Sequence, residues 1–293
     1  MSCIFGHSEK GLRETNEDME IIIDNKYFTV LGVCDGHGGC EVSKYISGLI
    51  PRLFNSSDFI HPIDNNQYKK ICLNIQNGLK KNNNYNSYNS GCTCTLFIKY
   101  KNIDSIIKNN IPLDKTIFKK SNYNELKKIA NKFITINIGD SRIIGCYKIN
   151  NKIIVEQLTK DHKPYDIKER NMIEKAGGEI KLIEGIYRVG GLSLSRSFGD
   201  CDIDCINSIP DIKRYKLNDL LFVIIACDGL YDVLENNKIC QFIIMNYYDK
   251  DLKLNKEKLK KDKKENNPAY QLCKLALNNE TQDNVSVIVY FNV

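Results

Sequence analysis

Acidic residues that follow apolar runs are the feature that most constrains how this 293-residue chain can fold. The run Phe28–Cys34 predicts a buried strand, and Asp35 follows it directly. The run Leu221–Cys227 predicts a second buried strand, and Asp228 follows that one. Neighbouring strand ends bring their side chains together, and clustered carboxylates repel each other unless a cation neutralises them. Strands that lie side by side would therefore gather these carboxylates around a bound cation.

Further acids stand at the ends of other predicted strands: Asp140 after Phe133–Ile138, Glu17 and Asp18 before Met19, and Asp283 before Val285. A single Asp at a strand end is ordinary turn chemistry. The residues alone therefore leave two interpretations open, a set of turns or a metal site built from several carboxylates. Oxygen ligands suit Mg²⁺ or Mn²⁺, whereas the four histidines and the lack of a C-x-x-C pair count against zinc.

Short β-branched runs and helical periodicity together indicate the fold class. The predicted strands are Met19–Ile23, Phe28–Cys34, Cys92–Tyr100, Phe133–Ile138, Arg142–Ile149, Lys152–Leu158, Leu221–Cys227 and Val285–Phe291. The predicted helices are Cys40–Phe54, Tyr68–Leu79, Asp166–Ala176 and Pro268–Leu277. Strands in hairpin-like succession with helices between them favour an α+β fold, in which antiparallel sheets pack in layers.

Three stretches differ in composition from the rest of the chain. Residues 81–90 are rich in Asn, residues 101–131 in Asn, Lys and Ile, and residues 250–267 in Lys. Because predicted strands or helices resume after each stretch, we interpret them as surface insertions in one domain that spans residues 1–293.

The charge and the cysteines exclude several classes of protein. The net charge is +6, but the tract Lys250–Glu265 holds eight lysines and four acids, so the excess is local and lacks the interleaved aromatic residues of a nucleic-acid surface. We expect no nucleic-acid partner, no membrane span and no secretory signal. The twelve cysteines fall mostly in or beside apolar runs, so we expect buried, reduced thiols in a cytoplasmic protein, with nuclear residence left open.

Blocks of sequence along nearly the whole chain resemble the type 2C metal-dependent serine/threonine protein phosphatases. The blocks, in the family's order, are Gly11–Asp18, Val33–Gly39, Ser90–Thr95, Gly139–Arg142, Asp161–Pro164, Leu194–Asp200, Asp228–Val233 and Gln282–Ser286. Each block would be weak evidence alone. Their number and order identify the chain as similar to this family.

The resemblance implies a fold and a metal centre. The fold would be a layered β-sandwich of two antiparallel sheets flanked by α-helices. Asp35, Asp228 and Asp283 would bind two Mg²⁺ or Mn²⁺ ions directly, with the carbonyl of Gly36. The other acidic positions would act around them: Glu17 and Asp18 would hold metal-bound waters or bind directly, while Asp140 and Asp232 would support a third, weaker ion.

The resemblance also implies the reaction. A hydroxide that bridges two ions would attack the phosphorus of phosphoserine or phosphothreonine in a protein, without a covalent phospho-enzyme. Arg13 would clamp the phosphate with its planar guanidinium, and His37 would protonate the leaving alkoxide as general acid. The expected partners are phosphorylated proteins in signalling, and the expected state is a monomer.

Some interpretations compete with this one. From the residues alone, His37 is a solvated turn residue and Arg13 a surface charge, while Arg142 and Arg196 are ion-pair partners in the sheets. The main functional alternative is a catalytically inactive pseudophosphatase scaffold on the same fold, and a phosphatase of small molecules is a third. The family's flap beside the active site would correspond to residues 163–192 and would influence the choice of substrate.

Overall fold

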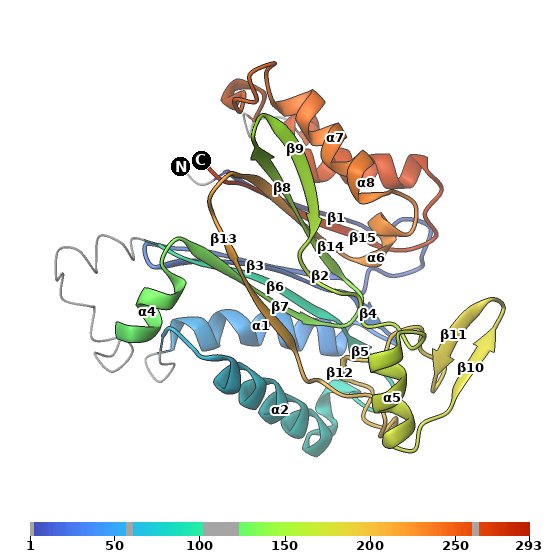
Figure 1. Cartoon of the computed structure of the whole chain (residues 1–293). Coiled ribbons are helices and arrows are strands. Elements are labelled where there is room, and N and C mark those ends of the chain that lie inside the picture. The colour runs from blue at the N-terminus through green and yellow to red at the C-terminus, as the bar shows by residue number, and fades with distance from the viewer. Residues whose placement is uncertain (1–2, 57–60, 102–122, 260–263) are drawn as a thin grey trace.

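Figure 1 shows the computed structural model of the chain, in which residues 3–56, 61–101, 123–259 and 264–293 are described. Two five-stranded antiparallel sheets lie face to face, and helices cover both outer faces. One sheet has the order β13 (Asp211–Lys216), β7 (Lys132–Ile138), β6 (Cys94–Tyr100), β3 (Phe28–Cys34) and β2 (Met19–Asp24). The other has the order β1 (Cys3–Glu9), β15 (Val285–Phe291), β14 (Leu220–Ala226), β8 (Arg142–Ile149) and β9 (Lys152–Gln157). The predicted layered α+β sandwich is confirmed.

The two helical layers lie on opposite outer faces of the sandwich. Helices α1 (Glu41–Asn55) and α2 (Asn65–Lys81) cover the β3 sheet, and α7 (Asn236–Tyr247) and α8 (Pro268–Asn278) cover the β14 sheet. The four layers enclose three apolar interiors, one between the sheets and one beneath each helical layer.

The central strands are apolar along their whole length because both of their faces are buried. In β3, Leu31 and Val33 point into the layer between the sheets, whereas Val30 and Cys34 pack under α1 and α2. The alternation follows from the two-residue period of a strand. Such strands read as continuous apolar runs rather than as alternating ones.

The strand registers bring the acid-bearing ends to one end of the sandwich. Met19 of β2 lies opposite Cys34 of β3, so Asp18 and Asp35 stand at the same end of that sheet. In the other sheet Ala226 of β14 lies opposite Val287 of β15, so residues 227–228 and 283–284 also meet.

Several smaller elements lie near this end. Strands β12 (Phe198–Gly199), β5 (Gly91–Cys92) and β4 (Gly36–His37) form a three-stranded sheet, and α6 (Asp228–Tyr231) follows β14. Helix α5 (Ile167–Lys175) precedes the hairpin of β10 (Ile180–Ile183) and β11 (Ile186–Val189). In Figure 1 this hairpin projects from the body of the protein.

The elements differ from the predicted ones in places. The run Cys92–Tyr100 is not one strand, because it divides at Thr93 into β5 and β6. Strands β1 and β13 and helix α7 were not predicted.

The compositionally distinct stretches are partly structured. Helix α4 (Tyr123–Ile129) buries Leu126 and Ile129 in the core beneath the β3 sheet, so the end of the 101–131 stretch is not a surface insertion. The 81–90 stretch holds the 3₁₀ turn η1 (Asn83–Tyr85), and the lysine tract holds η3 (Lys256–Leu259) and η4 (Lys264–Asn266). Residues 102–122 and 260–263 lie outside the described residues. Over the described part of the chain, every helix is too short or too polar to span a lipid bilayer.

Candidate metal centre and cleft

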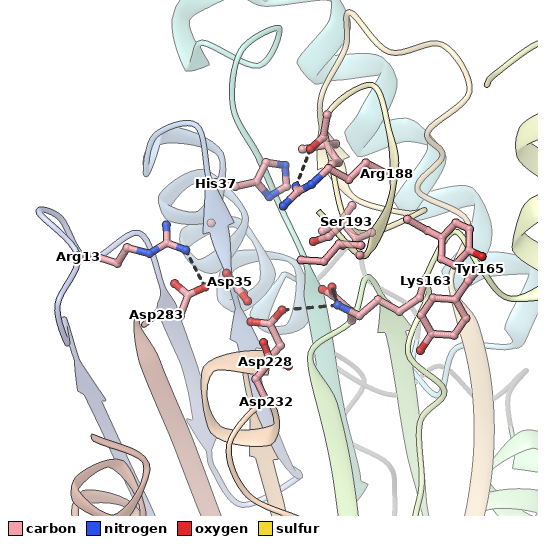
Figure 2. Close-up of a pocket in the computed structure, with 18 residues that line it drawn as sticks. Arg13, Asp35, His37, Lys163, Tyr165, Arg188, Ser193, Asp228, Asp232 and Asp283 are labelled. Carbon is pink, nitrogen blue, oxygen red and sulfur yellow. Dashed lines mark hydrogen bonds and ion pairs between the residues drawn. The ribbon is translucent and has the colours of Figure 1, made fainter. Parts of the chain in front are cut away.

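A cleft of about 530 Å³ opens at the end of the sandwich where the acids converge. Figure 2 shows its side chains, with carboxylates on the floor and cationic groups on the walls. Eight of the ten predicted site residues line it: Arg13, Asp35, Gly36, His37, Asp140, Asp228, Asp232 and Asp283. The structure therefore brings together residues that are up to 270 positions apart in the sequence.

Asp35 lies at the end of β3, where the chain leaves the sheet. Its backbone N–H donates to the Thr93 hydroxyl at 3.0 Å, and its carbonyl accepts from the Thr93 N–H at 2.8 Å, so the turn is held from both sides. Burial raises the pKa of Asp35 well above its usual range, and the charges of Asp18 and Asp228 raise it further. A Cβ at Gly36 would lie 2.4 Å from the carbonyl oxygen of Glu17, so only glycine fits there.

Asp18 is a buried acid of this group that lacks protein hydrogen-bond donors among the described residues. Its side chain is 4% exposed, and neither carboxylate oxygen has a hydrogen-bond partner among the described residues. Ligand atoms of Asp18, Asp35 and Cys227 all lie within 4.8 Å of one another. Burial, together with the charge of Asp283, raises the pKa of Asp18 to about 6. A buried carboxylate without a donor is costly, so this position suits a cation.

Asp140, Asp228 and Asp232 form a second group of carboxylates on the cleft floor. The Lys163 ammonium donates to Asp140 and lies 3.7 Å from Asp228 Oδ2. Burial would lower the pKa of Lys163, but the charges of Asp140 and Asp228 outweigh burial and raise it. Burial also raises the pKa of Asp228 well above its usual range, and Asp140 adds to the shift. Lys163 was not predicted as a site residue, although it lies in Asp161–Pro164, one of the sequence blocks that resemble the type 2C phosphatases.

Arg13 reaches the cleft from the loop after β1. Its Nη2 donates to Asp283 Oδ2 at 2.9 Å, and its Nε donates to the Gln282 carbonyl at 3.0 Å. The side chain remains 58% exposed. The guanidinium is thus held at the cleft edge with donor capacity left for a ligand.

The Glu17 carboxylate stands apart from the cleft floor. Its Oε2 accepts from the Gly39 N–H at 3.2 Å, and its Oε1 accepts from the Thr15 hydroxyl at 3.2 Å. Glu17 and Asp18 are the two predicted site residues that do not line the cleft, because Asp18 lies beneath its floor and Glu17 faces the turn before α1.

His37 forms an ion pair that was not predicted. Its Nε2 lies 2.8 Å and 2.9 Å from the two carboxylate oxygens of Asp200, which is 5% exposed and also accepts from the Ser197 hydroxyl. Burial would lower the pKa of His37, but the hydrogen bond and charge of Asp200 outweigh it and raise the pKa. A Cβ at Gly91 would lie 2.2 Å from Asp200 Oδ2, so glycine is needed behind the pair.

Asp200 closes the block Leu194–Asp200, and its acidic character was the only available signal. The sequence did not assign it a role because its partner is 163 positions away.

Two arginines are the ion-pair partners that the sequence predicted. Arg142 donates to both carboxylate oxygens of Asp161, and its guanidinium lies 4.5 Å from the centre of the Tyr231 ring. Arg196 is 2% exposed and donates to both oxygens of Glu169. These pairs are confirmed as structural contacts.

Comparison with known proteins finds similarity to the family that the sequence blocks resemble. The family model for protein phosphatase 2C matches residues 123–285. Protein phosphatase 1L of Bos taurus is 32% identical over 256 residues, which cover 81% of this chain and 62% of the bovine protein. Protein phosphatase 2C homolog 1 of Saccharomyces cerevisiae is 29% identical over 297 residues, which cover 95% of this chain and 89% of the yeast protein. The chain thus spans less than two thirds of the bovine relative.

A PP2C-like domain-containing protein of Acanthamoeba polyphaga mimivirus is 35% identical over 172 residues, and the alignment covers 53% of this chain and 92% of the viral protein. Among solved structures, a serine-threonine phosphatase 2C from Toxoplasma gondii superimposes with a TM-score of 0.73 at 19% identity, over 98% of this chain and 94% of that chain. The structural likeness shows the fold, and the family model matches more than half of the sequence. The chain belongs to the protein phosphatase 2C family.

Proposed function

We propose that the protein hydrolyses phosphoserine and phosphothreonine in other proteins, and that it uses two Mg²⁺ or Mn²⁺ ions. The observation that carries this proposal is the group of carboxylates at one end of the sandwich, in which the buried Asp18 lacks a donor for either oxygen among the described residues. Oxygen ligands of this kind fit hard divalent cations. We further propose that the chain acts as one catalytic unit.

The residues present fit such a centre. Asp35, Asp228 and Asp283 would hold the two ions with the carbonyl of Gly36, while Asp18 would act from beneath the floor. Glu17 would contribute through a bound water, because its carboxylate faces away from the cleft. Asp140 and Asp232 would support a third, weaker ion. When bound, the ions would supply Lewis acidity and an activated water as nucleophile.

The cationic side chains would act on the substrate itself. Arg13 would orient the phosphoryl group, because a planar guanidinium can donate to two phosphate oxygens at once. Lys163 would offset part of the negative charge on the floor, where it already contacts Asp140.

His37 would hold the proton that the leaving serine or threonine oxygen needs. A protonated imidazole is the effective donor near neutral pH, and the Asp200 carboxylate favours that form. Because Asp200 contacts Nε2, the atom that donates toward the cleft would be Nδ1, which has no hydrogen bond to any of the described residues.

The pseudophosphatase alternative predicts the loss of a ligand or of the phosphate-binding arginine. Every predicted ligand residue and Arg13 are present, which disfavours it. A phosphatase of small molecules would share the metal centre, and the choice of substrate separates the two. The twelve cysteines are free thiols and nine of them are buried, which supports our proposal that the protein works in a reducing, cytoplasmic compartment.

The test is phosphate release from a phosphothreonine peptide by metal-stripped protein, with and without added Mn²⁺ or Mg²⁺. We expect metal-dependent release, and Asp228→Ala should abolish it. Asp204→Ala is the matched control, because that carboxylate is 91% exposed on the surface and should leave release unchanged. A folded protein that releases no phosphate with either ion would favour the scaffold alternative instead.

A further inference from the structure

We propose that Arg188 binds a second anionic group on the substrate, either a carboxylate or a second phosphate, a few residues from the phosphorylated serine or threonine. The proposal rests on the proposed function and names the class of substrate that the cleft would favour. Its basis is the position and the pairing of Arg188 in the wall of the cleft.

Arg188 belongs to β11, the second strand of the projecting hairpin, and its half-buried side chain lines the cleft. Its Nη1 donates to the carbonyl of Gly191 at 2.8 Å, which anchors the guanidinium to the end of the hairpin. A guanidinium has five N–H donors, so this contact leaves most of them available.

Arg188 differs from the other two cationic side chains named in the cleft in its ion-pair partners. Arg13 forms an ion pair with Asp283, and Lys163 forms one with Asp140. By contrast, no described residue places a carboxylate in ion-pair contact with Arg188. A half-buried guanidinium has lost part of its hydration, and an anion restores the lost interactions better than any neutral group.

The two arginines stand on different walls. In Figure 2, Arg13 enters from one side of the carboxylates and Arg188 from another, beyond His37. One phosphoryl group held by Arg13 over the carboxylate floor would therefore leave Arg188 to a different group of the same peptide. Successive residues of an extended peptide advance about 3.3 Å each, so moving the anion one residue at a time along the peptide would locate the position that Arg188 contacts.

Aromatic rings border the cleft beside Arg188. The centres of the Tyr165 and Tyr187 rings lie 6.3 Å apart, and both rings line the cleft. The Arg170 guanidinium lies 5.7 Å from the centre of the Tyr187 ring and supports it from behind. Exposed rings that are held in place offer a flat surface on which a peptide backbone can pack. A peptide that lies along these rings would pass Arg188.

The experiment compares three sets of peptides that share one phosphothreonine. The first has neutral residues on both sides, the second carries one Asp at a position from one to four residues away, and the third carries at those positions the phosphonate analogue of phosphoserine, which cannot be hydrolysed. The ratio of kcat/KM between an anionic peptide and the neutral one measures the second site. The Asp and phosphonate series distinguish the two sources of the anion.

Arg188→Gln removes the charge and keeps a similar length. Lys181→Gln is the matched control, because Lys181 lies directly opposite Arg188 in the hairpin register but is 63% exposed and pairs with Glu179. We expect the wild-type protein to favour at least one anionic position about tenfold, because charged hydrogen bonds at a partly exposed site have roughly this effect. Arg188→Gln should bring the ratio near one, and Lys181→Gln should leave it unchanged.

Equal kcat/KM for anionic and neutral peptides in the wild-type protein would overturn the inference and leave the proposed function standing. A preference that survives Arg188→Gln, or disappears with Lys181→Gln, would also overturn it. No release from any peptide would overturn the proposed function and the inference with it. Affinity for a non-hydrolysable phosphonate peptide, measured by fluorescence anisotropy, should follow the same ratio.

Discussion

Replacing Asp18 with Asn would remove a buried negative charge that lacks a hydrogen-bond donor among the described residues. The pKa of Asp18 is raised from 3.8 to about 6, chiefly by burial. A carboxyl group whose pKa is raised by folding lowers stability once it ionises, so the loss begins above pH 4 and is complete above pH 6. A shift of about two pKa units corresponds to at most about 3 kcal/mol.

The assay is thermal unfolding of metal-stripped protein at pH 7.5 and pH 4. At pH 7.5 Asp18→Asn should be more stable than the wild-type protein by up to about 3 kcal/mol, or roughly 6–12 °C in Tm. At pH 4 most of the gain should vanish, because the wild-type carboxyl is then protonated in the folded state and no buried charge remains. Adding Mg²⁺ should raise the Tm of the wild-type protein and raise that of the variant less.

Asp204→Asn is the control, because its carboxylate is 91% exposed and its removal should change neither measurement. A variant that is no more stable than the wild-type protein at pH 7.5 would refute the claim that burial raises the energy of this carboxylate. An equal gain at both pH values would show that the effect does not come from ionisation. An undiminished response to Mg²⁺ would separate Asp18 from the metal centre.

Three further predictions concern other buried polar groups. Asp200→Asn should lower kcat on a phosphothreonine peptide by about tenfold or more. It should change the hydrolysis of p-nitrophenyl phosphate much less, because that leaving group needs no proton. Equal losses on the two substrates would contradict a role of Asp200 through His37. Burial lowers the pKa of His61 from 6.5 to about 4, so its contribution to stability is complete above pH 6.5 and is lost as the pH falls toward 4. Urea unfolding should show that His61→Phe removes about 2 kcal/mol of the stability difference between pH 7.5 and pH 5. Glu169→Gln removes a carboxylate partner of the buried Arg196 and should lower the free energy of unfolding by about 3 kcal/mol in the same assay. Glu179→Gln removes an exposed ion pair with Lys181 and should lower it by less than about 1 kcal/mol.

The acids at strand ends could be predicted because the strands that carry them are buried on both faces. Phe28–Cys34 and Leu221–Cys227 therefore stand out as apolar runs, and the acid after each run is conspicuous. Edge strand β13 is half exposed and mixes charged with apolar residues, so its pairing with β7 depends on the tertiary order of the sheet and not on a local pattern.

Helix α7 was not predicted either, but for a different reason. Ile239, Ile243 and Tyr247 recur every four residues and are all buried, so the sequence does carry a local helical pattern here. Asp200 and Arg188, by contrast, owe their significance to what lies across the cleft from them. Such contacts follow only from the folded arrangement, because residues that meet there are distant in the sequence.

The cleft takes ligand residues from both sheets, which has a mechanical consequence. Asp35 follows β3 of one sheet and Asp228 follows β14 of the other, so an ion bound by both would link the two sheets at this end. The distance between the sheets would then tune the affinity for the ion. That distance depends on side chains in the layer between the sheets, such as Phe97 and Tyr290, whose ring centres lie 5.1 Å apart. A repacked interior could thus weaken ion binding while every ligand residue stays in place.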